Sequence, residues 1–422
     1  MKKRRIIKAA ISLLLTGIVA VNLTGCTTQV QAADLMEGVS AAAVSGKAAD
    51  DSFIRSQMRL SVELFQSSVL ESKDKNVLIS PLSVQLALAM TANGAAGKTR
   101  EEMEQVLGGE IPIGELNEYL YSYVQSLPSE DKYKLEIANS IWFRDQKERL
   151  TVEKDFLQKN ADYYGAQAYK SPFDNQTVDD INSWVKNHTD GMIDKIIEEI
   201  GSDTVMYLIN ALVFDAEWEN IYDKSAILDG TFTAISGDKR TVEMMSSEES
   251  SYLDDGKATG FVKGYKGGKY SFATLLPNEG VDIYEYMAGL TGEGLLSTLE
   301  NAQSGTVMAT LPKFSYEYEL RMNDVLAGLG MPSAFDGGAA DFSKMAKSAN
   351  GNIYIGDVLH KTFISVDERG TKAGAVTKVE MVDESIPCYE KVVVLDRPFV
   401  YMLIDNATNL PLFIGAAMDI EK

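Results

Sequence analysis

The sequence predicts a mixed α+β fold built around large, mainly antiparallel sheets. Apolar residues at helical spacing dominate the first part of the chain, and alternating or uniformly apolar, β-branched segments dominate the last part. No internal repeat and no Pro- or Gly-rich linker divides the chain after residue 52. We therefore expect one domain over residues 53–422 and no regular βαβ winding. With 45% hydrophobic residues the chain can bury the core of such a domain.

Residues 1–25 have the organisation of a secretion signal. Basic residues at positions 2–5 precede an apolar run from Ile6 to Val21. A transmembrane helix is the alternative, but the run is short for a bilayer, which needs about 20 apolar residues, and Lys8 interrupts it. The end of the signal, Leu23-Thr24-Gly25-Cys26, resembles a bacterial lipobox. We therefore expect a secreted protein of bacterial lipoprotein type, anchored at the cell surface by lipid on Cys26.

The next segment and the overall charge limit the partners of the mature chain. Residues 26–52 are mostly small and polar and predict a flexible tether. Removal of the signal leaves 35 basic against 61 acidic residues, a formal charge of −26, so nucleic acid and anionic lipid headgroups are poor partners. If lipid occupies Cys26, Cys388 is the only free thiol, which excludes a disulfide framework and a cysteine metal site.

Helix signals mark the first part of the domain. Apolar residues recur near helical spacing over Phe53–Val69. Ser80-Pro81 provides an N-cap and a first-turn proline for a second helix, which Gly94 stops. A third helix has capping-box spacing at Thr99–Glu102 and ends at Gly108-Gly109.

Strand signals mark the rest of the domain, where apolar residues alternate or form short β-branched runs. The predicted strands are Leu135–Ile141, Met206–Phe214, Lys391–Leu395, Phe399–Ile404 and Leu412–Gly415. Gly267-Gly268 predicts a turn between two strands.

The sequence offers little for an active site. His188 and His360 are the only histidines, and no Gly-x-Ser-x-Gly places a nucleophile. Glu248-Glu249 and Asp254-Asp255 are candidate catalytic carboxylates or calcium ligands, but residues 246–256 read as a polar loop with solvated charges. His188 lies at a predicted helix end, where a solvated histidine is expected. We therefore predict a protein that is not an enzyme and has no cofactor and no metal.

The segment after Asp367 has an unusual composition, in which small residues, β-branched residues and glycine follow one another. With a period of two, one face is entirely uncharged: Thr371, Ala373, Ala375, Thr377, Val379 and Met381. Its Gly, Ala and Lys content makes it a poor strand by local propensity. An ordinary linker and an edge strand are alternatives if this segment is considered alone.

Five segments resemble, in the same order, the signature segments of the serpin family of serine protease inhibitors. They are Asn76–Ser83, Leu208–Phe214 followed by Trp218, Leu311–Phe314, His360–Phe363 and Asp396–Phe399. The resemblance runs from about Phe53 to the C-terminus. It implies a serpin fold of three β-sheets and about nine helices, with an exposed reactive-centre loop that here spans about residues 370–392.

The resemblance also assigns roles to residues. The hinge pattern of the family matches Glu368, Gly370, Thr371, Ala373, Gly374 and Ala375, with Gly374 as a departure among alanines. The hydrogen-bonded cluster beneath the opening sheet matches Ser80, Ser83, Asn210 and His360, and the aromatic residue near the start of insertion matches Trp218. In the implied mechanism a protease cleaves the loop, forms an acyl-enzyme and is trapped as the loop inserts into the main sheet, with Thr371 expected to enter first.

The family spacing also predicts the bond that the protease cleaves. Counting from Gly370 places it between Glu384 and Ser385, whereas counting back from Pro398 points some three residues later. The alternative sites are Val382, Met381 and Lys378. A Glu-Ser bond resembles the reactive centre of some gut-bacterial serpins that act on elastase-like proteases.

We therefore expect the protein to be a monomer that inhibits elastase-like serine proteases, with trypsin-like or subtilisin-like proteases as alternatives. A non-inhibitory binding or carrier protein with the serpin fold is the second hypothesis, for which a charged or proline-containing hinge is expected. A surface hydrolase is the third.

Overall fold

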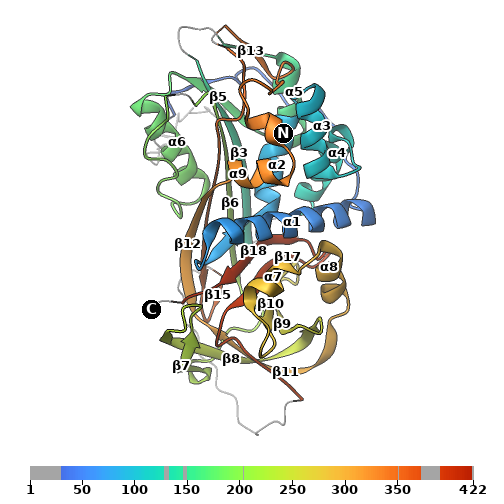
Figure 1. Ribbon diagram of the computed structural model, residues 1–422, viewed down its shortest axis with the longest axis vertical. Helices are drawn as coiled ribbons and strands as arrows, with labels where there is room; N and C mark the ends of the chain where they lie inside the picture. The colour runs from blue at the N-terminus through green and yellow to red at the C-terminus, as the bar shows by residue number, and fades with distance from the viewer. Residues whose placement is uncertain are drawn as a thin grey trace, which may run out of the picture.

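The computed structural model describes residues 30–127, 133–145, 150–202, 204–349, 351–371 and 390–420. Figure 1 shows an elongated molecule in which strands such as β3, β6 and β12 run vertically through the upper part, most helices lie beside them, and β7 to β11 form the lower end together with α7 and α8. The described residues form nine α-helices and three sheets, which confirms the predicted fold class. No helix within these ranges combines the length and the apolar character needed to cross a membrane.

The helices lie mainly in the first half of the chain. They are α1 (Asp51–Ser72), α2 (Pro81–Ala92), α3 (Gly97–Gly108), α4 (Ile113–Gln125), α5 (Lys154–Tyr164), α6 (Asn175–His188), α7 (Ile283–Ala288), α8 (Gly292–Glu300) and α9 (Asn323–Leu329). Two short 3₁₀ helices occupy Lys224–Ala226 and Pro332–Phe335.

Two large sheets contain most of the described strands. The seven-stranded sheet has the order β1 (Ala33–Asp34), β5 (Gln167–Ser171), β3 (Tyr133–Arg144), β6 (Met206–Glu217), β15 (Gly370–Thr371), β14 (Asp357–Val366) and β12 (Phe314–Arg321). The nine-stranded sheet has the order β16 (Lys391–Val394), β11 (Gln303–Pro312), β8 (Lys239–Asp254), β9 (Ala258–Gly264), β10 (Tyr270–Pro277), β17 (Phe399–Asp405), β18 (Pro411–Ala417) and β2 (Val77–Ile79), with β7 (Ile227–Thr233) paired to β8. The remaining sheet pairs β13 (Ala346–Ser348) with β4 (Leu150–Val152).

Helix α2 lies in the core between the two large sheets and contacts β6 and β18. All of its residues are buried, because it is apolar on every side. The Ser80 side chain caps it by accepting a hydrogen bond from the N–H of Ser83 at 3.3 Å. The predicted cap and first-turn proline of this helix are therefore confirmed.

The predicted capping box of the third helix is wrong. Helix α3 begins three residues earlier than expected, with Ala96 rather than Thr99 at the N-cap, so Thr99 lies inside the helix. The two side chains instead bind backbone groups far along the chain. Thr99 Oγ1 accepts a hydrogen bond from the N–H of Asp341 at 3.0 Å, and Glu102 accepts one from the N–H of Ser333 at 2.9 Å. Tertiary partners replaced the local cap.

The prediction of a flexible tether differs from the structure over residues 30–50, which lie against the domain. Strand β1 pairs antiparallel with β5. The buried carboxylate of Asp180 accepts hydrogen bonds from the N–H groups of Gln31 and Ala32, at 3.0 and 2.7 Å. The free edge of β5 and this carboxylate provide partners that the local composition does not reveal. The predicted signal and Cys26 lie outside the described residues.

Candidate functional site

The central strands β6 and β14 of the seven-stranded sheet diverge along their length. At one end they pair in parallel, and the last pair is Leu359 with Ile209. At the other end the two residues of β15 lie between them, and Thr371 pairs with Ala216 on one side and with Val366 on the other. Between these ends, residues 210–215 of β6 and 360–365 of β14 have no described pairing with each other. Figure 1 shows β15 at the lower end of this interval.

The interval between the two strands is closed rather than open. A cavity of only about 10 Å³ lies there, bounded by the facing side chains of β6 and β14 and by Thr371. The turn that follows α6, with Thr189, Met192 and Ile193, covers it. A strand that continues β15 therefore enters only if β6 and β14 separate and this cover moves. Such a strand would run antiparallel to both neighbours, as β15 does.

Only glycine fits at position 370, because the backbone of β6 lies directly against it. A Cβ atom at this position would lie 2.0 Å from the carbonyl oxygen of Ala216, which no real contact allows. The preceding turn is fixed by Asp367, whose carboxylate accepts from the N–H groups of Arg369 and Gly370 at 2.8 and 3.2 Å. These contacts aim the chain into the interval between β6 and β14.

Thr371 is already inside the sheet in the intact protein. Its side chain is 3% exposed, and its hydroxyl forms a hydrogen bond with the hydroxyl of Tyr265. The expectation that Thr371 is the first residue to enter on insertion is therefore wrong, because the ladder with Ala216 and Val366 has already formed. With a period of two, the next residue on the same face is Ala373.

Trp218 holds the turn before Gly370. Its indole Nε1–H donates to the carbonyl of Asp367 at 2.8 Å, and its backbone N–H donates to the carbonyl of Arg369 at 2.8 Å. The ring is fully buried and stacks on Tyr265 with centroids 4.5 Å apart. Glu368 forms an ion pair with Lys313 at 2.8 Å, and this hydrogen bond lowers the pKa of Glu368. The start of β15 is thus tied to β6, to β9–β10 and to β11–β12.

A buried ion pair beneath Trp218 was missed by sequence reasoning. Lys263 is 2% exposed, and its Nζ lies 2.7 Å from Glu249 Oε1 and 4.3 Å from the ring centroid of Tyr222. The prediction of a polar loop with solvated charges is therefore wrong at Glu249, because residues 246–254 belong to β8. The available signal was a lysine within the otherwise uncharged stretch of β9.

Three of the four residues expected beneath the sheet come together. The Nε2 of His360 accepts from the backbone N–H of Ser80 at 3.2 Å, and Ser80 in turn caps α2 through Ser83. His360 directly follows the last pair between β14 and β6, so the cluster lies where the strands diverge. Burial lowers the pKa of His360 to about 4, and the ring is neutral at pH 7. Asn210 lies opposite Asn139 in the β3–β6 ladder, and its side chain is outside the description.

The remaining predicted site residues lie outside the described residues. They are Ala373, Gly374 and Ala375 of the hinge, and Lys378, Met381, Val382, Glu384 and Ser385 around the expected cleavage bond.

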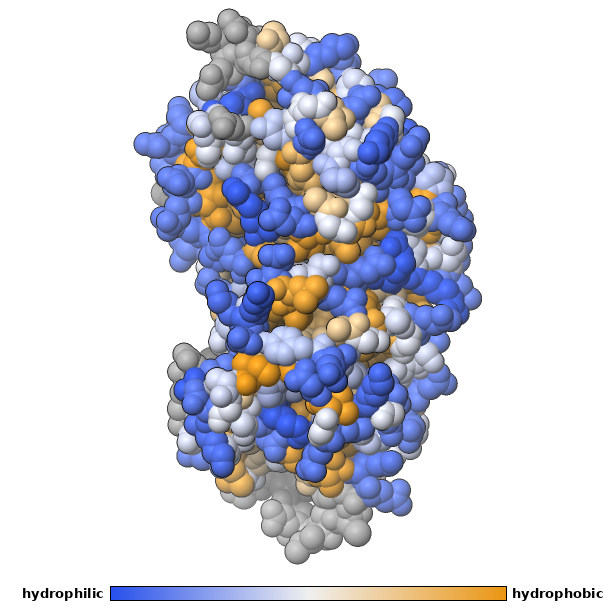
Figure 2. Space-filling model, in the orientation of Figure 1, coloured by the Kyte–Doolittle hydropathy of each residue, from blue (hydrophilic) through white to orange (hydrophobic). Residues whose placement is uncertain are grey.

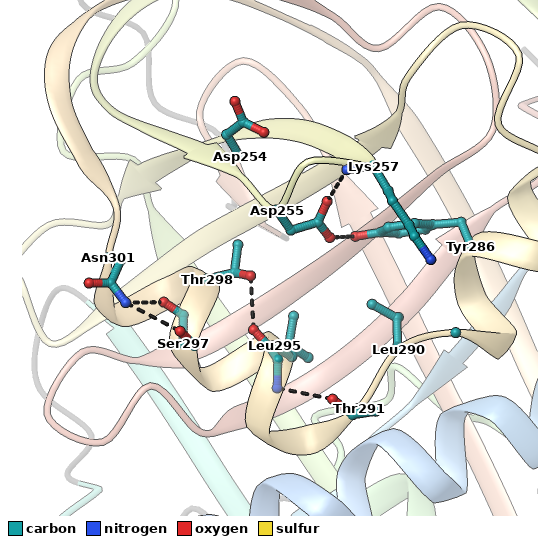
Figure 3. A pocket seen from close by; sticks show the side chains of 12 residues that line it. Asp254, Asp255, Lys257, Tyr286, Leu290, Thr291, Leu295, Ser297, Thr298 and Asn301 are labelled. Carbon is teal, nitrogen blue, oxygen red and sulfur yellow. Dashed lines mark hydrogen bonds between the residues drawn. The ribbon is translucent and has the colours of Figure 1, made fainter.

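A second concavity, of about 440 Å³, lies between the β8–β9 turn and helices α7 and α8 (Figure 3). Both oxygens of Asp255 are used there: one accepts from the N–H of Lys257 at 2.8 Å and the other from the hydroxyl of Tyr286 at 2.8 Å. Asp255 thus shapes the turn, and the geometry does not support its role as a catalytic carboxylate. Over the described ranges, no group of three His, Cys, Asp or Glu side chains is arranged to hold a metal ion.

The fold and the site define a protein whose main sheet contains the first two residues of a strand, β15, which can be extended only if β6 and β14 separate. The family described as Serpin (serine protease inhibitor) matches residues 55–420. Human Serpin B4 is 30% identical over 84% of this chain and 95% of its own length. The chain belongs to the serpin family, which is described as a family of serine protease inhibitors.

Solved structures agree with this assignment. The native state of the thermophilic serpin tengpin is 51% identical, with a TM-score of 0.89 over 93% of this chain and 100% of that chain. Human thyroxine-binding globulin is 25% identical, with a TM-score of 0.78 over 88% of this chain and 100% of that chain.

Proposed function

We propose that this chain is an inhibitory serpin that traps a serine protease covalently. The observation that carries the proposal is the interval between β6 and β14, with Thr371 already paired at its entrance. Residues on the same face as Thr371 in the following segment are small or uncharged, so they suit a buried position between two strands. The face that contains Thr371 carries none of the charged residues or prolines that a non-inhibitory hinge is expected to have.

The chemistry of the trap belongs to the protease. Its serine attacks the carbonyl carbon of the bait residue, the peptide C–N bond breaks, and the new amino terminus departs with a proton, which leaves an ester between protease and loop. The freed loop then extends β15 between β6 and β14 and carries the protease with it. Inhibition succeeds when this insertion is faster than hydrolysis of the ester. The neutral cluster of Ser80 and His360 lies on the path, because it marks the point where the strands diverge.

We propose Glu384-Ser385 as the bait bond and elastase-like serine proteases as the targets, with cleavage after Val382, Met381 or Lys378 as alternatives. Incubation with elastase-like, trypsin-like and subtilisin-like proteases, followed by a denaturing gel and mass spectrometry of the released peptide, tests both parts. We expect a complex that survives denaturant and a new amino terminus at Ser385. Complete cleavage with full recovery of protease activity would contradict the proposal.

The second candidate is a binding or carrier protein, which the similarity to thyroxine-binding globulin supports. Melting temperatures separate the two candidates. If the cleaved loop inserts, the sheet gains a strand and the cleaved form melts well above the intact protein. Equal melting temperatures would favour the binding protein. A surface hydrolase differs from both, because it would keep its activity when the loop is removed.

We further propose that the protein is exported and held at the cell surface by lipid on Cys26. The signal-like residues 1–25 and the lipobox-like sequence before Cys26 support this location. Residues 30–50 run along β5 and α4–α5, so the connection between the lipid and the domain is shorter than the sequence predicted.

A further inference from the structure

Strand β12 forms an unpaired edge of the seven-stranded sheet. It pairs with β14 on one side over its full length, from Phe314 with Val366 to Arg321 with Leu359. In the described part of the sheet no strand lies on its other side. The eight residues of β12 therefore present a row of backbone N–H and C=O groups over about 26 Å.

A groove of about 670 Å³ runs along this edge. Its other wall consists of residues 71, 72 and 74–76, at the end of α1 and in the turn after it, together with residues 419–420. The hydroxyls of Tyr318 and Ser72 lie 2.8 Å apart and join β12 to that wall. In Figure 2 the left outline of the molecule is indented at the height of β12, and hydrophilic side chains predominate along that margin. The groove is thus long, narrow and open to solvent.

Both walls of the groove carry acidic residues. Its charged lining residues are five carboxylates and one ammonium group: Glu71, Asp74, Glu317, Glu319 and Asp419 against Lys75. Glu317 and Glu319 are two residues apart and both lie on the exposed face of β12. Lys361 of β14 contacts both, at 3.2 and 3.6 Å, and so neutralises one of their two charges, while Asp419 is paired with Arg240 at 2.7 Å. A net negative charge remains next to the free backbone groups.

We propose that this edge is a docking site for a cationic extended segment of another protein, which adds to β12 as a further strand. The backbone groups of β12 supply the hydrogen bonds for strand addition. Lysine or arginine side chains at alternate positions of the incoming strand would lie opposite Glu317 and Glu319, in cross-strand pairs on the exposed face. Those pairs set the register and exclude acidic or neutral strands.

A second copy of this chain is a poor occupant. Pairing of two β12 edges brings the glutamates of both copies to one interface, and each chain carries a formal charge of −21. The site is also independent of the proposed inhibition, because β14 separates β12 from the interval that accepts the loop.

The test uses the peptide acetyl-Thr-Lys-Val-Lys-Val-Lys-Thr-amide, titrated into the intact protein by calorimetry at low salt. Three comparisons are needed: a peptide with glutamate for lysine, a lysine peptide with alternate backbone amides methylated, and the protein variant Glu317→Lys/Glu319→Lys. The matched control variant is Glu198→Lys/Glu199→Lys, which reverses two exposed glutamates outside the groove. Hydrogen exchange on the wild-type protein maps the site without any substitution.

We expect saturable binding of the lysine peptide, slower exchange of β12 amides in its presence, and an affinity at least tenfold lower for Glu317→Lys/Glu319→Lys. The Glu198→Lys/Glu199→Lys variant should remain within twofold of wild type, and the glutamate and methylated peptides should not bind. Equal binding of the methylated peptide would overturn strand addition. Equal losses in the two protein variants, or protection that maps outside β12, would overturn the site. A peptide-independent dimer formed through β12 would assign the edge to a second copy instead.

Discussion

The backbone N–H of Ser80 donates a hydrogen bond to Nε2 of His360, 3.2 Å away, and joins the start of α2 to β14. His360 is the first residue of β14 beyond its pairing with β6, so this bond lies directly beneath the fork in the sheet. Separation of the strands has to move β14 relative to α2. The bond is therefore placed to resist opening of the sheet until the loop begins to insert.

Because His360 is buried in its neutral form, the folded protein should lose stability in mild acid. Burial lowers its pKa from 6.5 to about 4, so as the pH falls the unfolded chain binds a proton before the folded protein does. The stability contributed by the neutral ring is present above about pH 6.5 and is lost progressively down to about pH 4, by a total on the order of 3 kcal/mol. Urea unfolding of wild type and His360→Gln between pH 7 and pH 4.5 measures this. The difference between the two proteins should shrink in acid, and parallel curves would show that His360 does not titrate as described.

Gly370→Ala should loosen the start of β15. A methyl group 2.0 Å from the carbonyl of Ala216 forces the two strands apart, and we expect a loss of about 1–3 kcal/mol in the free energy of unfolding. Gly305→Ala in β11 is the matched control, because a Cβ atom there meets nothing within 4 Å. Denaturant unfolding should show a change within about 0.5 kcal/mol for the control. Similar losses in both variants would mean that the close approach at Gly370 does not determine the effect.

Local signals predicted the elements that depend on local chemistry. Ser80-Pro81 starts α2 as expected, because a cap and a first-turn proline act within a few residues of each other. Thr99 was wrongly assigned as a cap because Asp341, far along the chain, binds its hydroxyl. Lys263 was missed because its burial depends on Glu249 of the neighbouring strand. The period of two correctly placed Thr371 on a buried face, but it did not show that the sheet already contains it.

Cys26→Ser should release the protein from the membrane or leave it unprocessed. The lipobox-like sequence makes this thiol the only expected lipid acceptor, and lipid is the only expected anchor. Membrane fractions washed with high salt, together with metabolic labelling by a fatty acid, measure the outcome. Cys388→Ser is the control and should stay membrane-bound and labelled. Equal retention of Cys26→Ser would contradict the lipoprotein assignment.

Ala373→Arg should convert the inhibitor into a substrate. Thr371 is already in the sheet, so Ala373 is the next residue on the same face, and an arginine there would have to bury an unpaired charge between β6 and β14 as the loop enters. Thr371→Arg is the weaker test, because it would also displace the hydroxyl that bonds Tyr265 in the intact protein. Lys372→Glu, on the opposite face, is the control.

The measurement is the number of moles of inhibitor consumed per mole of protease inactivated, together with the melting temperature of each intact variant. We expect Ala373→Arg to melt like wild type and to be cleaved at the same bond, because the described pairing of β15 with β6 and β14 ends at Thr371. Its consumption per protease should rise at least tenfold, since slower insertion gives the ester time to hydrolyse. Lys372→Glu should stay within twofold of wild type. Equal rises at both positions would show that the two faces of the loop are not distinguished on insertion, and the assignment of the strand register between β6 and β14 would fail with it.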